Sequence, residues 1–584
     1  MPMKVLFTGI PGVNLGEHVE RLRKCVTEST VYRRSVYKLL KAEEHFVSGV
    51  KESNLLPEDY YKFLKKPELM IQALGLPKPL LRKAWATALQ RTLDSEKPAS
   101  QDDVFLCMHS AFYHQATREF FSPVDADIVK GWHPDLVITL IDDIENCFDR
   151  LRVPGHMFSD SAYVYTGMKG FNNVLKNMRV LYDWRAIDML EAERLAAEIG
   201  VRHFCVAVKH PIETFASLVF TSRSVVYLSH PISEPRRRLA GGDRKAFDEF
   251  TAQLGETCSR LRRGVTLIEP TTIDEFRLLR IKTPSREEGD ASVDLYLPRH
   301  VERWPCPPDP LWIKPGDEAA QPLDMGGCFA EETLNAFKKF RVEAAGGSLP
   351  VEFIPMEIAD NLLSVLIGDI TSQIDARDHK LVEQSGGLVV LRPVYKGNSS
   401  NGVEEEIKYH CQLCAIGEVR KAGLWIYTHR DDEFDYLRKE WLVGYLSEGL
   451  KNGTIEASGD AAVDEKAIRA LAESLTFTAI RAELASQVLQ EMTARKIRFK
   501  GNKGREGPLA PRPEMALVDA QRKFMADLEV AKPPYVAILE KAKKLRPDLH
   551  SKILSGPEIS VDEFIGQVLQ SCAQVTEEPA KGDA

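Results

Sequence analysis

The sequence predicts an α/β protein with two doubly wound parallel-sheet domains followed by an α-helical C-terminal region. Over residues 1–446, short apolar, β-branched runs alternate with longer segments of helical periodicity, and glycine-bearing loops follow several of the runs. Such alternation is typical of βαβ units with parallel strands. From residue 447 to about residue 573, alanine-, leucine- and glutamate-rich segments keep a helical period.

Length and composition indicate a multidomain globular protein. The 584 residues can hold about three domains. Hydrophobic residues make up 44% and charged residues 28%, and the net charge of −8 does not indicate a nucleic-acid binder. No apolar run reaches the roughly eighteen residues of a membrane span, and the N-terminus lacks a signal-peptide layout. Since the ten cysteines fall mostly in apolar segments, we expect reduced thiols and a cytoplasmic location.

The first predicted domain, 1–222, opens with a buried strand at Lys4–Thr8 and a glycine-rich turn into a helix. This is the context of a phosphate-binding P-loop, G-x-x-x-x-G-K-[ST]. With the later strands at 104–108, 136–141 and 204–208, the succession resembles the adenylate-kinase-like P-loop nucleotide kinases. The resemblance implies a magnesium-facing acid at Asp142 or Asp143, and a basic lid from Lys169, Lys176 and Arg179.

The loop departs from the P-loop motif at the residues that do chemistry. Aligned on Gly9, the motif lysine becomes Leu15 and the hydroxyl residue becomes Gly16, and a shift by two residues puts Glu17 and His18 there. Neither register supplies the cation for the phosphates or the hydroxyl for magnesium. We therefore expect an inactive kinase-like domain, kept for structure, partner contact or ligand sensing. An anion could still meet the backbone N–H groups of Gly9, Gly12, Asn14 and Gly16.

The second predicted domain, 223–446, is organised around residues 385–414. The apolar run 388–391 predicts a buried strand, the glycines and asparagines of 397–402 predict a polar loop, and a helix is expected near Val403. This order is how an open α/β sheet presents a ligand site at its carboxyl edge. Glu404 to Glu406 fall in the expected first turn, where a solvated helix start explains the first two. A strand at 225–228, a helix at 246–261, a strand at 265–268, an insertion at 282–325 and helices at about 329–342 and at 370–383 complete the domain.

Three segments of this domain resemble motifs of the nucleoside 2-deoxyribosyltransferases and their relatives, the deoxynucleoside 5′-monophosphate N-glycosidases. Residues 227–232 (YLSHPI) are similar to the family's first strand and loop, and 374–378 (IDARD) to its helix with a site aspartate. Residues 400–407 (SNGVEEEI) are similar to the signature S-x-G-V-x-x-E-[LI], which ends in the catalytic glutamate. The resemblance covers roughly 224–445 and departs at His230-Pro231, where the family usually has a small residue or glycine.

The resemblance implies a set of site residues. Glu406 takes the place of the catalytic glutamate, Asp378 positions the sugar or base or protonates the departing base, and Tyr227 orients Glu406. The implied substrate contacts, of which the two serines and the arginine would hold a phosphate, are Ser229, His230, Ile232, Arg236, Ser400 and Gly402. Simpler interpretations stay open: a core tyrosine, a salt bridge between Asp378 and Arg377, and a solvated turn around the arginine triplet 236–238.

The chemistry of these residues fits N-glycosidic bond cleavage. The bond breaks through an oxocarbenium-like sugar, which a nearby carboxylate stabilises or captures covalently. We therefore expect an enzyme without a cofactor that hydrolyses the N-glycosidic bond of a nucleotide. One alternative is an NAD glycohydrolase in stress or antiviral defence, which needs the same glutamate. Another is a nucleotide-binding regulatory protein without turnover.

Ser400 bears on the form of the substrate. In the resembling family this position is an acid in enzymes that act on free nucleosides and a serine in those that act on monophosphates. A carboxylate here would repel a phosphate, whereas a hydroxyl can donate to it. The resemblance therefore implies a substrate with a 5′-phosphate.

Other motifs favour structural explanations. Cys411, Cys414 and His410 lack a second ligand pair for zinc, so core cysteines are expected and no metal site is predicted. The basic run 495–505 fits a solvated loop better than a nucleic-acid contact. The C-terminal helices suggest homo-oligomerisation or docking.

Overall fold

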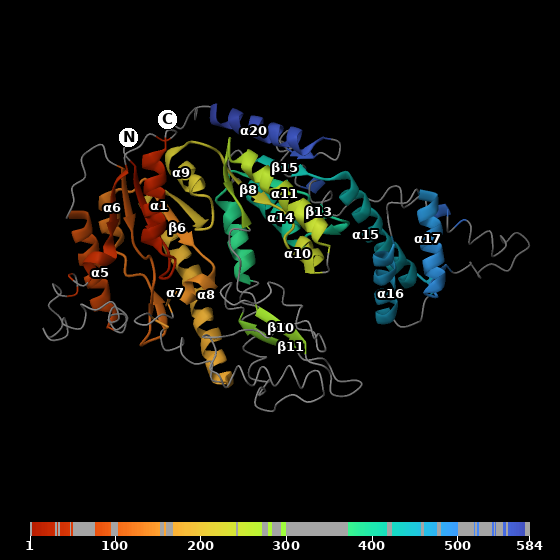
Figure 1. Ribbon diagram of the computed structural model, residues 1–584, viewed down its shortest axis with the longest axis horizontal. Coiled ribbons are helices and arrows are strands. Elements are labelled where there is room, and N and C mark those ends of the chain that lie inside the picture. The colour runs from red at the N-terminus through yellow and green to blue at the C-terminus, as the bar shows by residue number, and fades with distance from the viewer. Residues whose placement is uncertain are drawn as a thin grey trace, which may run out of the picture. The chain divides into compact units, whose positions relative to one another are not determined.

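The computed structural model (Figure 1) is an α/β protein built on parallel sheets, as the sequence predicts. The structure describes residues 3–29, 32, 36–46, 48, 50, 76–94, 103–151, 157–158, 167–240, 243–270, 278–282, 294–298, 372–416, 423–456, 461–475, 481–499, 519, 522–524, 540–541, 544, 553–555 and 559–577. The chain divides into two compact units, Met1–Val225 with Thr266–Ser385, and Val226–Val265 with Gly386–Ala584.

A five-stranded parallel sheet forms the centre of the first unit. Its order is β2-β3-β1-β6-β7, from β1 (Lys4–Thr8), β2 (Val36–Lys41), β3 (Asp103–Cys107), β6 (Leu136–Ile141) and β7 (Arg202–Ala207). The central strand β1 pairs with β3 and β6, so Phe7 lies opposite Cys107 on one side and Ile138 on the other. Because β1 and β6 are buried along nearly their whole length, they read as continuous apolar runs rather than alternating ones.

Helices cover the sheet of the first unit. They are α1 (Leu15–Glu28), η1 (Ala42–His45), α5 (Lys78–Asp94), α6 (Ala126–Trp132), α7 (Ile144–Leu151), the long α8 (Gly167–Ile199) and α9 (Ile212–Phe220). Helix α1 contacts α9, and α8 contacts β6 and β7. A small hairpin joins β4 (Phe112–His114) and β5 (Glu119–Phe121). The unit also includes β9 (Thr266–Ile268) and the antiparallel pair β10 (Leu278–Lys282) and β11 (Asp294–Pro298).

Four parallel strands of the second unit lie in the order β18-β15-β12-β8. They are β8 (Val225–Ser229), β12 (Gly387–Leu391), β15 (Gly423–Tyr427) and β18 (Ile553–Ser555). Gly387 lies opposite Gly423 in the register of β12 and β15. The Trp425 indole packs over both glycines, and a Cβ on Gly423 would lie 2.0 Å from a ring carbon. Only glycine therefore fits at this pair.

A short hairpin stands where a polar loop is predicted after β12. Strands β13 (Val394–Tyr395) and β14 (Asn398–Ser399) pair across Lys396 and Gly397, which have φ values of 48° and 76°. Positive φ at both central residues is typical of a type I′ turn, which matches the twist of a hairpin. Gly397 lies in the turn as expected, but Asn398 and Ser399, which were expected in the loop, form β14, because strands of two residues are too short to show an alternating pattern in the sequence.

The remaining helices of the second unit are α10 (Ser233–Ala240), α11 (Arg244–Leu261), α14 (Asn401–Ile416), α15 (Arg430–Lys451), α16 (Ala461–Ser474), α17 (Arg481–Ala494) and α20 (Val561–Glu577). Figure 1 shows α20 beside β15 and α11, both of which it contacts. Helices α15, α16 and α17 share an apolar core that includes Leu446, Ile468 and Val488. A two-residue pair, β16 (Ile455–Glu456) with β17 (Arg498–Phe499), closes this part.

The C-terminal region is therefore not purely helical, since β18 extends a parallel sheet. Among the residues that the structure describes, no helix is long and apolar enough to cross a membrane. The predicted insertion 282–325 begins at the last residue of β10 and contains β11. Its other residues lie outside the described residues, as do the helix expected at 329–342 and the basic run from residue 500 onward.

Candidate active site

Two hydroxyl groups hold a buried carboxylate in the second unit. The Tyr227 hydroxyl donates to Oε1 of Glu406 at 2.7 Å, and the Ser229 Oγ donates to Oε2. Glu406 is 7% exposed, and the two hydroxyl-bearing residues are fully buried. The structure thus brings together three residues that the sequence singles out, 179 and 177 positions apart along the chain.

The fold explains why these side chains meet. Tyr227 and Ser229 are two residues apart on β8, so they point to the same face of the sheet. Parallel pairing sets Ser229 opposite Val390 near the carboxyl ends of β8 and β12, where open α/β sheets bind ligands. Helix α14 begins at Asn401, two residues earlier than predicted, so Glu406 lies in its second turn rather than its first.

The three consecutive glutamates of α14 have different surroundings. Glu405 is exposed and forms an ion pair with Lys408. Glu404 is half-buried; burial raises its pKa, and a hydrogen bond from the Ser399 side chain opposes that rise. Glu406 alone of the three faces the hydroxyls of β8. One turn further along α14, His410 is fully buried, and burial lowers its pKa to about 4, so it is neutral at pH 7.

A buried ion pair holds the hairpin that precedes α14. Arg392 Nε donates to Asp432 Oδ2 at 2.5 Å, and the other oxygen of Asp432 accepts from the Lys396 backbone N–H at 2.8 Å. Arg392 has a φ of 51°, which is unusual for a residue that precedes proline. Asp432 thereby holds residues on both sides of β13. No sequence signal marked this pair, because its partners are 40 residues apart.

The loop and helix after β8 also attach to this hairpin. Glu234 Oε1 accepts from Asn398 Nδ2 at 2.8 Å, and Arg238 donates to Glu234 and to the Lys396 carbonyl. Arg238 thus connects α10 to the hairpin. Arg236, the predicted phosphate contact, lies on the same helix α10. Of the two remaining loop candidates, His230 is buried against Phe250, with its Nδ1 3.2 Å from the Pro231 carbonyl, and Ile232 is half-buried.

Ser400 and Gly402 lie at the N-terminus of α14. Ser400 is half-buried, its N–H donates to the Pro393 carbonyl at 3.2 Å, and its carbonyl accepts from the Glu404 N–H. Gly402 is exposed, and no atom lies within 4 Å of where its Cβ would be. The helix start is therefore open to solvent at the position where a substrate phosphate is predicted.

Asp378 belongs to the first compact unit, on a helix described from residue 372 to 383. Arg377 donates to its Oδ1 through Nε at 3.0 Å and through Nη2 at 2.8 Å. Asp378 therefore forms the salt bridge with Arg377 that the simpler interpretation of the sequence predicts.

The glycine-rich loop of the first unit is packed against its own neighbours. A Cβ at Gly9 would lie 2.9 Å from the Leu140 carbonyl oxygen, and one at Gly12 would lie 2.8 Å from that of Cys147. Gly12 has a φ of 92°, and Asn14, also left-handed with a φ of 57°, caps α1 without a side-chain hydrogen bond. Close backbone approach therefore explains Gly9 and Gly12 without a phosphate.

Cations around this loop are engaged with protein groups. Arg150 Nη1 donates to the Gly12 carbonyl at 2.6 Å and to Asp142 Oδ2 at 2.7 Å, and Lys209 forms an ion pair with Asp143. His109 Nδ1 donates to the Gly9 carbonyl at 2.5 Å, and its Nε2 forms an ion pair with Glu43. Burial alone would lower the pKa of His109, but the Glu43 carboxylate and the Gly9 carbonyl raise it to about 9.

One cation lies beside the first turn of α1. Lys41 Nζ is 3.4 Å from the position that a Cβ of Gly16 would occupy, and 3.6 Å from Glu44 Oε1. The motif lysine is missing at residue 15, and the sequence could not indicate that the ammonium of Lys41, from β2, lies beside the same helix start.

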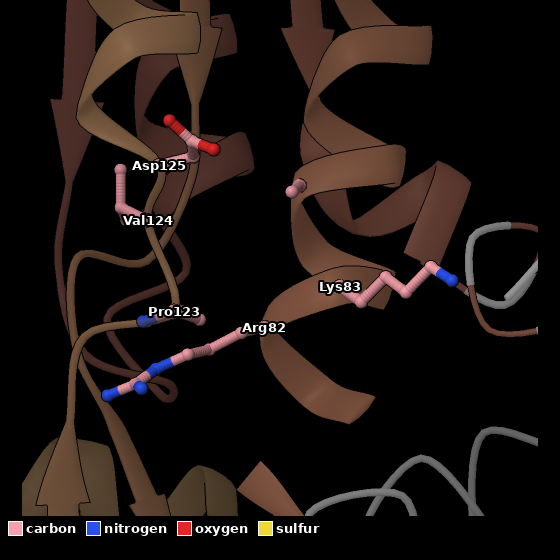
Figure 2. Close-up of a pocket in the computed structure, with 6 residues that line it drawn as sticks. Arg82, Lys83, Pro123, Val124 and Asp125 are labelled. Carbon is pink, nitrogen blue, oxygen red and sulfur yellow. The ribbon is translucent and has the colours of Figure 1, made fainter. Parts of the chain in front are cut away.

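The first unit also contains an open cavity of about 380 Å³ between α5 and the segment before α6. Figure 2 shows the Arg82 side chain reaching toward the Pro123 segment, whereas the Lys83 side chain extends the opposite way. None of the predicted site residues lines this cavity. The described part of the chain holds no cluster of three potential metal ligands. Cys411 and Cys414 are buried, as expected of core cysteines.

Comparison with known proteins adds no family. No protein-family model matches the sequence, and no curated protein is similar enough to count as a match.

Proposed function

We propose that the second unit hydrolyses the N-glycosidic bond of a nucleotide that carries a 5′-phosphate. The supporting observation is the buried Glu406 carboxylate, held by the Tyr227 and Ser229 hydroxyls at the carboxyl edge of a parallel sheet. Burying a carboxylate is costly unless it is hydrogen-bonded, and such groups gather at functional sites.

In the proposed reaction the bond between C1′ of the sugar and the base nitrogen breaks, and its electron pair leaves with the base. Glu406 stabilises the resulting oxocarbenium-like C1′ or bonds to it. Water then attacks C1′, so that its hydroxyl stays on the released sugar phosphate, any bond to Glu406 breaks, and the second proton of the water goes to the base. Tyr227 keeps the carboxylate oriented through its hydrogen bond to Oε1. Asp378, for which the resemblance implied contact with the sugar or base, belongs to the first compact unit and pairs with Arg377, so the proposed step does not use it.

The 5′-phosphate is proposed to bind at the start of α14. This helix has sixteen residues, and its free N–H groups and positive dipole end favour an anion beside Ser400 and Gly402. A dinucleotide such as NAD also carries a phosphate on the 5′ oxygen of the ribose whose bond at C1′ would break. Cleavage of that bond needs the same glutamate. Such a dinucleotide is therefore the second substrate that this site supports.

The finer architecture belongs to the same proposal. We take both sheets to be doubly wound, the first unit to be an inactive kinase-like domain, and the residues from 447 onward to be a mainly helical part of the second unit, whose sheet β18 extends. We also take the protein to work in the cytoplasm and to need no cofactor for the cleavage step.

The proposal is tested by incubating the full chain with pooled deoxynucleoside and ribonucleoside 5′-monophosphates and NAD. Free bases and nicotinamide are separated by chromatography. We expect release of a base from at least one phosphorylated substrate and less release from its free nucleoside. Binding of a nucleotide without any product would instead establish a regulatory protein, and nicotinamide release alone would establish the NAD reaction.

A further inference from the structure

Ser229 has a different partner from the one that the sequence implied. The resemblance assigned it to a substrate phosphate, but its Oγ donates to Oε2 of Glu406 and its side chain is fully buried. We propose that Ser229 is a positioning residue for Glu406 and not a phosphate ligand. The kinetic consequence of this role rests on the proposed function, whereas the role itself rests on the contact between Ser229 and Glu406.

Hydrogen-bond counting supports this assignment. A serine hydroxyl has one proton to donate, and a phosphate near neutral pH is chiefly an acceptor. Once the Ser229 proton is given to Glu406, the hydroxyl has only acceptor capacity left, which a phosphate cannot use. The position of Ser229 on β8 points the same way, because the two-residue spacing puts it on the same face as Tyr227, whose hydroxyl serves the same carboxylate.

Two hydroxyls restrain the orientation of the Glu406 carboxylate more than one hydroxyl would. With Tyr227 on Oε1 and Ser229 on Oε2, the carboxylate is held at both oxygens, so rotation about its last side-chain bond is restricted. Both donors are neutral, so they orient the group without cancelling its negative charge. A carboxylate oxygen can accept about two hydrogen bonds, so a single hydroxyl does not exhaust the capacity of either one. Loss of Ser229 should therefore affect the chemical step and leave substrate binding unchanged.

The proposal divides the two serines of the site by role. Ser229 acts on the carboxylate, and Ser400, half-buried at the start of α14, remains for the phosphate. The two variants Ser229→Ala and Ser400→Ala are thus a matched pair, since each removes one hydroxyl from one residue of the same type.

The kinetic arm measures kcat and KM of both variants on the best phosphorylated substrate. A hydrogen bond to a charged group is worth enough that Ser229→Ala should lower kcat about 10- to 100-fold, with KM within about twofold of wild type. Ser400→Ala should raise KM about 10-fold and change kcat little. A rise in KM without loss of kcat for Ser229→Ala would overturn the proposal.

The second arm does not need turnover. The midpoints of thermal unfolding are measured for wild type, Ser229→Ala, Glu406→Ala and the double variant. Ser229→Ala shifts the midpoint in wild type and in the Glu406→Ala background. If Ser229 donates to Glu406, these two shifts should differ by about 2–4 °C, in either direction. Equal shifts in both backgrounds would overturn the contact. If wild type cleaves nothing while the coupling is present, the proposed function fails and the Ser229 assignment stands.

Discussion

Two helices begin after glycine-bearing segments, α1 in the first unit and α14 in the second. The carboxylates near these two helix starts have different hydrogen-bonding partners. Around α1, Asp142 pairs with Arg150 and Asp143 with Lys209. Beside α14, the buried Glu406 receives hydrogen bonds from two neutral hydroxyls. A cation next to a carboxylate stabilises its charge and lowers its reactivity, whereas neutral donors fix its orientation.

The glycines of the two starts differ as well. Gly9 and Gly12 have no room for a side chain because backbone atoms lie against them, whereas Gly402 faces open space. The first loop is therefore closed by packing, and the second is accessible. A glycine pattern alone therefore does not identify a ligand site, because the same residue type allows close packing at Gly9 and Gly12 and leaves open space at Gly402.

The largest effect is expected at Glu406. Glu406→Gln keeps the shape but removes the charge, so turnover should fall about 10²- to 10⁴-fold while substrate binding survives. Glu405→Gln is the matched control, since the Glu405 side chain is exposed and its ion pair with Lys408, at 3.1 Å, is of the exposed kind that contributes little to stability. Base release under saturating substrate is the measurement. A fully active Glu406→Gln protein would end the assignment.

The next effect concerns stability. Asp432→Asn leaves Arg392 buried beside a neutral amide, and breaking a buried ion pair in this way costs about 3–5 kcal/mol. Asp142→Asn should cost less, because its partner Arg150 is 37% exposed and can turn to water. Urea unfolding measures both costs, and amide hydrogen exchange over residues 394–399 reports the hairpin. Equal costs, or a hairpin that stays protected without Asp432, would contradict the role given to this pair.

A smaller, substrate-dependent effect is expected at Ser400. Ser400→Asp places a negative charge beside the proposed phosphate position, so kcat/KM for the phosphorylated substrate should fall about 10- to 100-fold. The free nucleoside, which carries no phosphate, should be affected far less. The ratio of the two kcat/KM values is the readout, and Ser400→Asn, which has nearly the shape of aspartate without its charge, is the control. Equal or better cleavage of nucleosides by the unmutated protein would sink the 5′-phosphate requirement.

A pH effect is expected in the first unit. Although burial lowers the pKa of His109, Glu43, the Gly9 carbonyl and Asp188 together raise it to about 9. Since this folded-state pKa lies above the unfolded value of 6.5, the stability it contributes is present below pH 6.5 and is lost as pH rises through 9. The thermal midpoint of the first unit should fall over this range, and His109→Gln should remove that part of the fall. A wild-type midpoint that rises between pH 6.5 and 9 would show that His109 is neutral.

The sequence was informative where a pattern is local. The strands of β1, β6 and β12 and the helical span of α11 were expected within one or two residues, because apolar runs and helical periods are set by neighbouring residues. The hydroxyl of Tyr227 reached Glu406 as the resemblance implied. What could not be predicted depends on pairs distant in the chain: Arg392 with Asp432, Ser229 with Glu406, and Lys41 beside Gly16. The strand β18 was also missed, because three residues carry no usable period.

The smallest expected effect is the absence of phosphoryl transfer by the first unit. Leu15 and Gly16 stand where the motif needs a lysine and a hydroxyl, so magnesium-dependent release of phosphate from ATP should not exceed that of a protein-free control. The structure makes this a sharper test, because Lys41 Nζ lies beside Gly16 and is the nearest substitute for the missing lysine that the geometry offers. Its ammonium is 3.6 Å from Glu44 Oε1, which competes with any phosphate for it. If the wild-type protein nevertheless turns over at about one per second, the usual kinase range, Lys41→Ala should abolish that activity and Lys41→Arg should retain part of it. Turnover that survives Lys41→Ala would mean that neither the loop nor β2 provides the cation, and the contrast drawn between α1 and α14 would then be wrong.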